Sequence, residues 1–242
     1  MTALIQSNHY LQVQFMNPLS NNLELNLDSK TPQELIELLH LTERWQETTD
    51  NKFFLYKANP IMEIFHTSKA KTRAIFGGNR SGKTYSTIME AAMCFIGVVP
   101  KSLESLVPVY RIKPSNRIRI CTIDYPNNFV KVVWELIQTL IPSDFIKDVI
   151  KEQGRVKAIT NHDGGFIEFM QYEQDVKKFQ GSSRHLIIYD EEPPMSIRDE
   201  NLMRLVDTDG EEIFGLTPVS EIDRPMIWIY DELYEKAARN VE

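Results

Sequence analysis

The chain has 242 residues, of which 42% are hydrophobic and 25% are charged, a composition that excludes fibrous and disordered classes of protein. Its formal net charge of −7 also excludes a uniformly basic coat for nucleic acid. Residues 51–184 nevertheless hold 20 basic and 12 acidic residues, whereas residues 1–50 carry a net charge of −5 and residues 185–242 one of −10. Only the middle segment is suited to face a polyanion.

Residues 1–55 are predicted to form a small, acidic, mainly helical region. Leucine and isoleucine recur with helical spacing between residues 35 and 41. A helix that begins near Thr31 would place Pro32 in its first turn, where proline is favoured.

From residue 71 onwards, apolar runs alternate with stretches of helical periodicity. Strands are predicted at residues 74–76, 117–123, 186–190 and 212–217, helices at 83–96 and 127–140, and a hairpin from residues 156–160 and 166–172. This alternation favours an α/β fold with a mainly parallel sheet. Residues 97–116 contain three prolines and are predicted to run over the surface, and residues 220–242 are predicted to be an exit segment.

The two cysteines, Cys94 and Cys121, lie inside apolar runs and lack the spacing of metal ligands or of a redox pair. They are interpreted as buried thiols in a reducing compartment. The N-terminus lacks the basic and apolar regions of a signal peptide, and the longest apolar stretch, residues 88–100, contains Glu90 and is too short to span a bilayer. We therefore expect neither export by such a signal nor a transmembrane segment.

The sequence GGNRSGKT, residues 77–84, matches the pattern G-x-x-x-x-G-K-[S/T] of a phosphate-binding loop. It follows a predicted strand and opens a predicted helix, so the backbone N–H groups of the turn and the helix N-terminus would both face phosphate oxygens. Lys83 would reach the β- and γ-phosphates, and the Thr84 hydroxyl would ligate Mg²⁺. The predicted nucleotide-binding residues are Gly77, Gly78, Asn79, Arg80, Ser81, Gly82, Lys83, Thr84 and Tyr85.

The sequence LIIYDEE predicts a buried strand that ends in the carboxylates Asp190, Glu191 and Glu192. Ligands of open α/β sheets bind at the carboxyl ends of the strands, so these acids would lie beside the phosphate loop. We expect Asp190 on the Mg²⁺ side, Glu191 as the residue that polarises the attacking water, and a structural role for Glu192. A metal ligand next to a base for water favours hydrolysis over transfer to a small molecule, and thus a nucleoside triphosphatase.

Two further residues are candidates for the same edge of the sheet. Thr217 ends a predicted strand before Pro218 and would place a hydroxyl where it senses the γ-phosphate. Arg80 in the loop would complement charge that develops on the triphosphate. A simple Thr-Pro turn and a solvated loop arginine are the alternative interpretations.

In this order, the motifs GGNRSGKT, FIEFMQYEQDVKKFQG, LIIYDEEP and LTP resemble the ATPase domain of the large terminase subunit of tailed bacteriophages, over about residues 56 to 235. The resemblance implies a P-loop NTPase fold of the RecA/ASCE type, with an ATPase core at residues 56–219 and an N-terminal lid subdomain at residues 1–55. It implies that ATP and Mg²⁺ are bound by Lys83, Thr84 and Asp190. It further implies that Glu191 is the catalytic base, Arg80 the loop arginine, and Thr217 the residue that couples hydrolysis to movement.

The resemblance also implies partners: double-stranded DNA, the portal of the procapsid and the small terminase subunit, in the cytoplasm of the infected bacterial host. Such a motor works as a homo-oligomeric ring on the portal, and we expect a monomer in isolation and no membrane contact. Family members continue into a nuclease domain. Residues 220–242 would lead towards such a domain, none fits after residue 235, and no DNA cleavage by this chain is expected.

The sequence departs from the family pattern upstream of the loop. Met62 stands where family members place a glutamine that contacts adenine, and stacking of the base on Tyr56 or Phe65 is expected to replace that contact. Ring motors usually complete the site with an arginine from a neighbouring subunit. The favoured candidate is Arg184, and Arg198 and Arg204 are the alternatives. Contacts of Lys177 and Lys178 with DNA are a weaker expectation, because lysines are ordinarily solvated.

Two other classes of function remain open on the sequence. One is a different RecA-like, DNA-dependent ATPase, such as a helicase or a recombinase. The other is a nucleotide-gated scaffold that binds ATP and scarcely hydrolyses it. Intact Lys83, Asp190 and Glu191 favour an enzyme over the scaffold.

Overall fold

The computed structural model describes residues 4–6, 10–13, 23–26, 31–37, 51–218 and 227–234. The chain forms two compact units, residues 1–55 and residues 56–242. Across the described ranges, no helix combines the length and the apolar character that crossing a membrane requires.

The first unit contains a three-stranded antiparallel sheet, in the order β1 (Leu4–Gln6), β2 (Tyr10–Val13) and β3 (Leu23–Asn26). The expectation of a mainly helical region is therefore wrong for the described residues. The predicted helix is present at residues 32–37, and it starts with a capping box in which Thr31 and Glu34 exchange hydrogen bonds of 2.7 Å and 3.3 Å. Strands of three or four residues are too short to show a clear alternation of apolar and polar side chains.

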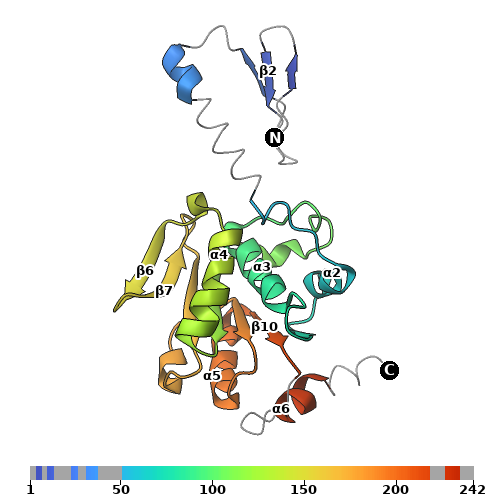
Figure 1. Ribbon diagram of the computed structural model, residues 1–242, viewed down its shortest axis with the longest axis vertical. Coiled ribbons are helices and arrows are strands. Elements are labelled where there is room, and N and C mark those ends of the chain that lie inside the picture. Colours follow the sequence, from blue (N-terminus) through green and yellow to red (C-terminus); the bar gives the residue numbers. More distant parts are fainter. Residues whose placement is uncertain are drawn as a thin grey trace. The chain divides into compact units, whose positions relative to one another are not determined.

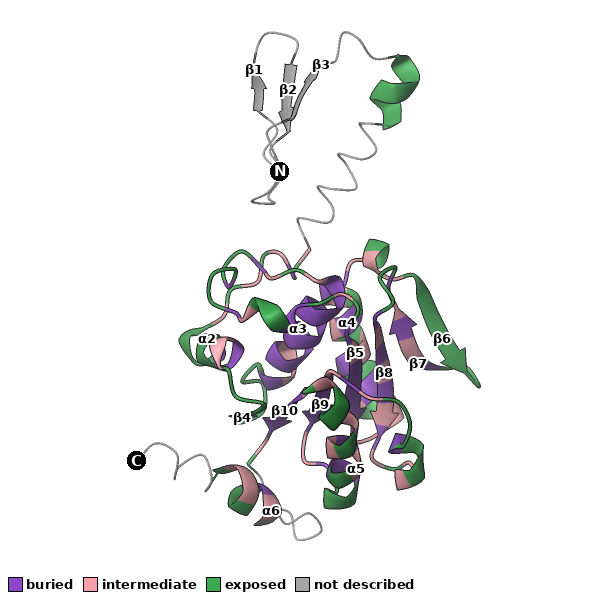
Figure 2. Ribbon diagram, turned by 180° about the vertical axis from the view of Figure 1, so that it is seen from behind, coloured by how far each residue is buried: buried purple, intermediate pink, exposed green. Residues whose placement is uncertain are grey.

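The second unit is built on a seven-stranded sheet (Figure 1) in the order β4-β10-β9-β5-β8-β7-β6, with the strands labelled in Figure 2. The strands are β4 (Thr72–Phe76), β5 (Arg117–Thr122), β6 (Asp148–Glu152), β7 (Arg155–Thr160), β8 (Phe166–Gln171), β9 (Leu186–Asp190) and β10 (Glu211–Leu216). The strands from β4 to β8 in this order run parallel, and β7 and β6 extend the sheet antiparallel. The predicted mainly parallel α/β sheet is confirmed, and so is the hairpin of β7 and β8.

Helices cover both faces of this sheet. They are α2 (Pro60–Thr67), α3 (Lys83–Ile96), α4 (Glu135–Leu140) and α5 (Met195–Leu205). Alternate residues of β10 contact helices on opposite faces of the sheet. Gly215 faces Thr87 of α3 on one face. On the other face, Phe214 and Leu216 pack in one cluster with Ile197 of α5. The central strands β9 and β10 and the helix α3 are buried along their length, whereas β6 at the edge of the sheet is exposed (Figure 2). A strand buried on both faces has no polar alternation, which is why LIIYD is apolar until its last residue.

The described part of the predicted exit segment packs on this core. It consists of α6 (Ile227–Ile229) and a π-helical turn, Tyr230–Tyr234. Ile229 is 1% exposed within the cluster on the α5 face, and the Trp228 ring lies 6.3 Å from the Phe214 ring. Residues 227–234 therefore pack against the core, and residues 220–226 and 235–242 of the predicted exit segment lie outside the described ranges.

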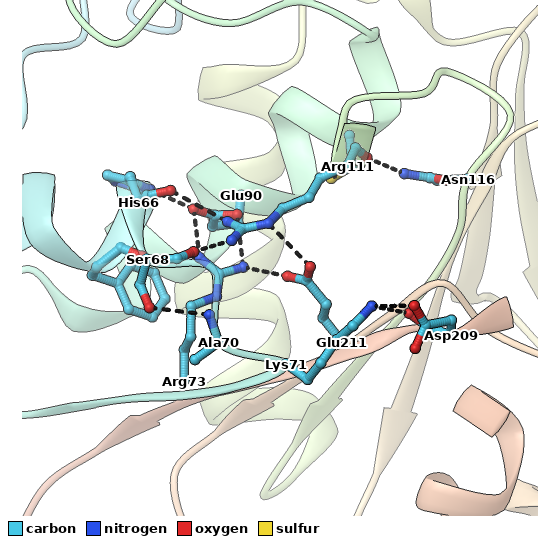
Figure 3. Close-up of polar contacts among 12 residues, drawn as sticks. His66, Ser68, Ala70, Lys71, Arg73, Glu90, Arg111, Asn116, Asp209 and Glu211 are labelled. Carbon is cyan, nitrogen blue, oxygen red and sulfur yellow. Dashed lines mark hydrogen bonds and ion pairs between the residues drawn. The ribbon is translucent and has the colours of Figure 1, made fainter. Parts of the chain in front are cut away.

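A buried network of ion pairs ties together the amino ends of β4 and β10 (Figure 3). Arg73 donates to Glu90 at 3.1 Å and to Glu211 at 3.0 Å, and Arg111 pairs with Glu211 at 3.0 Å. The Nδ1 atom of His66 lies 2.7 Å from Oε1 of Glu90. Burial by itself raises the pKa of Glu90, but the charge of Arg73 and the bond with His66 outweigh it and lower the pKa to about 2.

Candidate active site

The order of the strands brings the sequence motifs together at one edge of the sheet. β10 lies between β4 and β9 and is parallel to both, with Gly215 opposite Ile75 of β4 and Asp190 of β9. The carboxyl ends of these strands therefore meet. They carry the glycine-rich loop of residues 77–82, Thr217, and the pair Asp190 and Glu191.

The glycine-rich loop leads from β4 into the buried helix α3. Gly82 takes the N-cap position of the helix at φ 91°, a left-handed conformation that suits glycine and no bulky residue. Lys83 follows and is 6% exposed, and its Nζ donates to the Gly78 carbonyl at 3.1 Å. The ammonium group thus lies over the loop, next to the backbone groups that would cradle a phosphate.

The Asp190 carboxylate is buried and is held through both of its oxygens. The Thr84 hydroxyl donates to Oδ1 at 2.7 Å, and the Asn128 amide donates to Oδ2 at 3.0 Å. Burial raises the pKa of Asp190, and these two hydrogen bonds oppose the rise. A hydroxyl beside a carboxylate is an oxygen donor set that fits Mg²⁺. Within the described ranges, no three His, Cys, Asp or Glu side chains gather, so phosphate oxygens and water would supply the other ligands.

Glu191 continues the β9 ladder by one residue and then turns the chain. Its N–H donates to the Gly215 carbonyl at 2.9 Å, and its φ of 68° is strained for a residue with a side chain, at a cost of about 1–3 kcal/mol. Thr217 holds both carboxylate oxygens, the N–H at 2.8 Å and the hydroxyl at 2.6 Å. Tyr172 donates to the Glu191 carbonyl at 2.9 Å. Thr217 therefore sets the direction of this carboxylate, while Gly215 and Tyr172 hold the Glu191 backbone.

The comparisons with known proteins agree with this architecture. No protein-family model and no curated protein matches the chain. Among solved structures, the large terminase ATPase domain of Thermus phage P74-26 is 16% identical with a TM-score of 0.50, over 74% of this chain and 70% of that one. The fold is that of a large terminase ATPase domain. The large terminases of another thermophilic bacteriophage and of bacteriophage HK97 are 14% and 12% identical, both with a TM-score of 0.52.

The chain spans less than half of those last two terminases. It covers 42% of the chain from the thermophilic bacteriophage and 38% of the HK97 chain, whereas 78% and 75% of the present chain are aligned. At these identities, the likeness establishes the terminase fold and leaves the site to be argued from its own geometry.

On the terminase fold, one of the two predicted base-stacking residues lies beside the loop. The Tyr56 ring stacks on the Tyr85 ring, with centroids 5.7 Å apart and planes at 28°, and its hydroxyl meets the His66 ring at 2.9 Å. Met62 is buried, and its Cε lies 3.9 Å from the point where a Cβ of Gly82 would be. Met62 is thus beside the loop but offers an apolar surface to a base.

Phe65 does not lie where a base could stack on it. It is 7% exposed, and the guanidinium of Arg73 covers its ring at 5.0 Å. The expectation that Phe65 contacts the base is therefore wrong. Helical spacing on α2 turns Phe65 towards the sheet, the same side as Met62.

Arg184 does not lie at the carboxyl edge of the sheet with the other candidate residues. It precedes β9, so the length of that strand separates it from Asp190, and it is 4% exposed. Its guanidinium donates to Glu168 at 2.5 Å and 2.8 Å and to the Ser182 carbonyl at 2.6 Å. The guanidinium is thus engaged within the chain and buried, an arrangement that disfavours Arg184 as the arginine supplied in trans.

The alternatives to Arg184 are also paired within the chain. Arg198 binds Glu212 at 2.8 Å, and Arg204 binds Glu200 at 3.2 Å. Arg80, in contrast, is exposed in the glycine-rich loop, at a positive φ of 63°.

Two residues of the edge were not predicted from the sequence, Asn128 and Tyr172. Both come shortly after strands that end at the carboxyl edge, Asn128 after β5 and Tyr172 after β8. The rule that placed Asp190 there applies to these strands too. What the sequence does not show is that β5 lies next to β9, which brings the first helical turn after β5 over Asp190.

Proposed function

We propose that the chain is a Mg²⁺-dependent ATPase whose hydrolysis drives double-stranded viral DNA into procapsids, as the motor domain of a large terminase subunit. In this proposal the fold is a P-loop NTPase fold of the RecA/ASCE type. The observation that carries it is the bond between Thr84 and Asp190, because it joins the loop helix to the acidic strand 106 residues later, at the place where Mg²⁺ would bind.

The loop residues would bind the triphosphate. Lys83 would exchange the Gly78 carbonyl for β- and γ-phosphate oxygens, and the N–H groups of residues 77–84 would face the remaining oxygens. Arg80 is exposed beside this loop and would complement the charge on the γ-phosphate. Tyr56 and Tyr85 present aromatic surface for the base.

Hydrolysis would follow from the positions of Asp190 and Glu191. Mg²⁺, bound through Thr84 and Asp190, would neutralise charge on the phosphate oxygens. Glu191 would orient a water molecule and take one of its protons while the water oxygen bonds to the γ-phosphorus. The bond from that phosphorus to the β–γ bridging oxygen breaks, which leaves ADP and phosphate.

Thr217 would couple this step to movement. Each carboxylate oxygen has a second lone pair, so Glu191 can accept a hydrogen bond from water while Thr217 still holds it. A displacement of the end of β10 would then change the direction of the base. Thr217 therefore connects the position of a strand to the competence of the site.

The proposed partners are double-stranded DNA, the portal of the procapsid and the small terminase subunit, in the cytoplasm of an infected bacterium. The chain would act there in a homo-oligomeric ring. The terminase fold and the net positive charge of residues 51–184 support this setting. The arginine that a neighbour would supply is none of Arg184, Arg198 and Arg204 in their present pairs.

The test is phosphate release from MgATP by the chain at high concentration, without DNA, with double-stranded DNA and with single-stranded DNA. We expect measurable turnover that double-stranded DNA raises. Stimulation by single strands alone would favour the helicase or recombinase class. Tight ATP binding without turnover in every condition would favour a nucleotide-gated scaffold, and no binding at all would reject the ATPase.

A further inference from the structure

Asn128 is half-buried, and only the nitrogen of its side-chain amide is used. Its Nδ2 donates to Asp190 Oδ2 at 3.0 Å, while its Oδ1 is buried and has no hydrogen-bond partner. Buried polar atoms nearly always have a partner, so a lone acceptor next to a functional carboxylate requires an explanation. If the amide were flipped, its oxygen would face the Asp190 carboxylate oxygen and the two acceptors would repel each other. The atom next to Asp190 is therefore the amide nitrogen.

The local backbone is shaped to bring this amide to Asp190. The Asp124 carboxylate caps the helix after β5 and accepts from the N–H groups of Asn127 and Asn128 at 2.6 Å and 3.3 Å. The helix then runs as a π-helix from Tyr125 to Trp134, anchored by the buried Phe129. π-Helical turns are rare in proteins as a whole, and those that occur are often found at functional sites. Here the wide turn places Asn128 over the end of β9.

We propose that Asn128 is a positioning residue for the Mg²⁺ ion, an inference that rests on the proposed ATPase function. Its NH₂ group holds Asp190 Oδ2 while Thr84 holds Oδ1, so the carboxylate cannot rotate. Its Oδ1 would accept a hydrogen bond from a water molecule bound to the ion. Mg²⁺ keeps several water ligands, and each of these waters needs acceptors for its hydrogen bonds. The unpartnered Oδ1 of Asn128 would supply such an acceptor beside Asp190.

The experiment measures the affinity for the slowly hydrolysed analogue ATPγS by calorimetry, in excess Mg²⁺ and in EDTA. The variants are Asn128→Ala and Asn128→Leu; leucine keeps most of the side-chain volume and removes both polar atoms. In both, the gain in affinity that Mg²⁺ gives is expected to fall by about 10- to 100-fold, while affinity in EDTA stays at the wild-type value. A purely structural role would lower both affinities together or neither.

Asn127→Ala is the matched control. Asn127 is the neighbouring asparagine on the same helix, is exposed, and accepts from Lys131 at 2.9 Å, so its Mg²⁺ dependence is expected to equal that of the wild type. The inference is overturned if Asn128→Leu and Asn128→Ala keep the full Mg²⁺ dependence, which leaves the ATPase proposal intact. Wild-type protein that binds no ATPγS in either buffer would instead reject the proposed function itself. Thermal unfolding identifies any variant that fails to fold.

Discussion

At the scale of single residues, the carboxylates of the edge are held before any ligand arrives. Thr84 and Asn128 bind the two oxygens of Asp190, and Thr217 binds both oxygens of Glu191. In the proposed hydrolysis, such preorganisation would lower the cost of orienting a metal ion and a water molecule. The strained φ of Glu191 is consistent with a functional position, since strain collects where geometry must be exact.

The buried Arg184 leads to a prediction about stability. Arg184→Gln removes one of the two arginines that pair with Glu168, since Arg119 also donates to this carboxylate at 2.5 Å. The free energy of unfolding is expected to fall by about 1–3 kcal/mol, because hydrogen bonds of a buried guanidinium to Glu168 and to the Ser182 carbonyl are lost. Denaturant titration measures the change. The control Arg155→Gln removes an exposed arginine that only covers the Tyr125 ring at 4.9 Å, and is expected to cost about 1 kcal/mol or less. Unchanged stability with lower turnover in Arg184→Gln would restore a catalytic role for this residue.

The two cysteines give a second prediction at this scale. Burial raises the pKa of Cys94 and of Cys121 to about 12, so hardly any thiolate forms near neutral pH. Native protein at pH 8 is expected to react with no equivalent of a thiol reagent, and denatured protein with two. Fast labelling of the native protein would contradict the burial of these side chains.

Predictability from the sequence differs between residues for a physical reason. Lys83, Thr84 and Asp190 lie in motifs whose local context, a strand end or a helix start, already fixes their place. Arg184 and Phe65 have partners on other elements, Glu168 of β8 and Arg73 of β4, and no pattern within one element reveals such a partner. The position of Asn128 beside Asp190 could be predicted only with the knowledge that β5 lies next to β9 in the sheet.

At the scale of elements, the close approach of α3 to β10 holds the loop against the sheet. A Cβ on Gly215 would lie 3.4 Å from Thr87 and 3.6 Å from Lys83. The strand therefore needs a small residue where the helix that carries Lys83 and Thr84 crosses it. Strongly periodic or fully apolar elements such as α3 and β9 were predictable, whereas β6 and the short strands of the first unit were not, because exposed or very short strands have a weak pattern.

Gly215 allows a graded test of this packing. Gly215→Ala adds a methyl group at ordinary contact distance and is expected to change the stability by less than about 1 kcal/mol, whereas Gly215→Val overpacks the contact and costs about 1–3 kcal/mol. Gly215→Val should also weaken ATP binding, since it presses on Lys83. Chemical denaturation and nucleotide titration measure the two effects. Equal behaviour of the two variants would show that α3 does not press on β10.

At the scale of the whole molecule, the ion-pair network at the amino ends of the strands lies opposite the candidate site and ties β4, α3 and β10 together (Figure 3). Its charges are desolvated, so it contributes stability only while they remain paired. Glu90 is its most deeply buried acid, at 0% exposed. The stability of the core should therefore depend on the ionisation of this one carboxylate.

This dependence gives a prediction about pH. The pKa of Glu90 is lowered in the folded protein from 4.5 to about 2, so its contribution is complete above pH 4.5 and is lost as the pH falls towards 2. The size of the shift corresponds to about 3 kcal/mol. In Glu90→Gln the acid limb of the stability curve between pH 4.5 and 2 should flatten, and stability at pH 7 should fall. Glu104→Gln, at an exposed glutamate, should follow the wild type, and an unchanged acid limb in Glu90→Gln would contradict the network.

The central claim is that Glu191 activates water for the hydrolysis of ATP at the carboxyl edge of the sheet. The most direct measurement is steady-state phosphate release from MgATP by Glu191→Gln, with Glu192→Gln as the neighbouring control. Turnover by Glu191→Gln is expected to fall at least about 100-fold while ATPγS still binds, and Glu192→Gln should remain close to the wild type. Wild-type turnover by Glu191→Gln, or an equal loss in both variants, would contradict the claim.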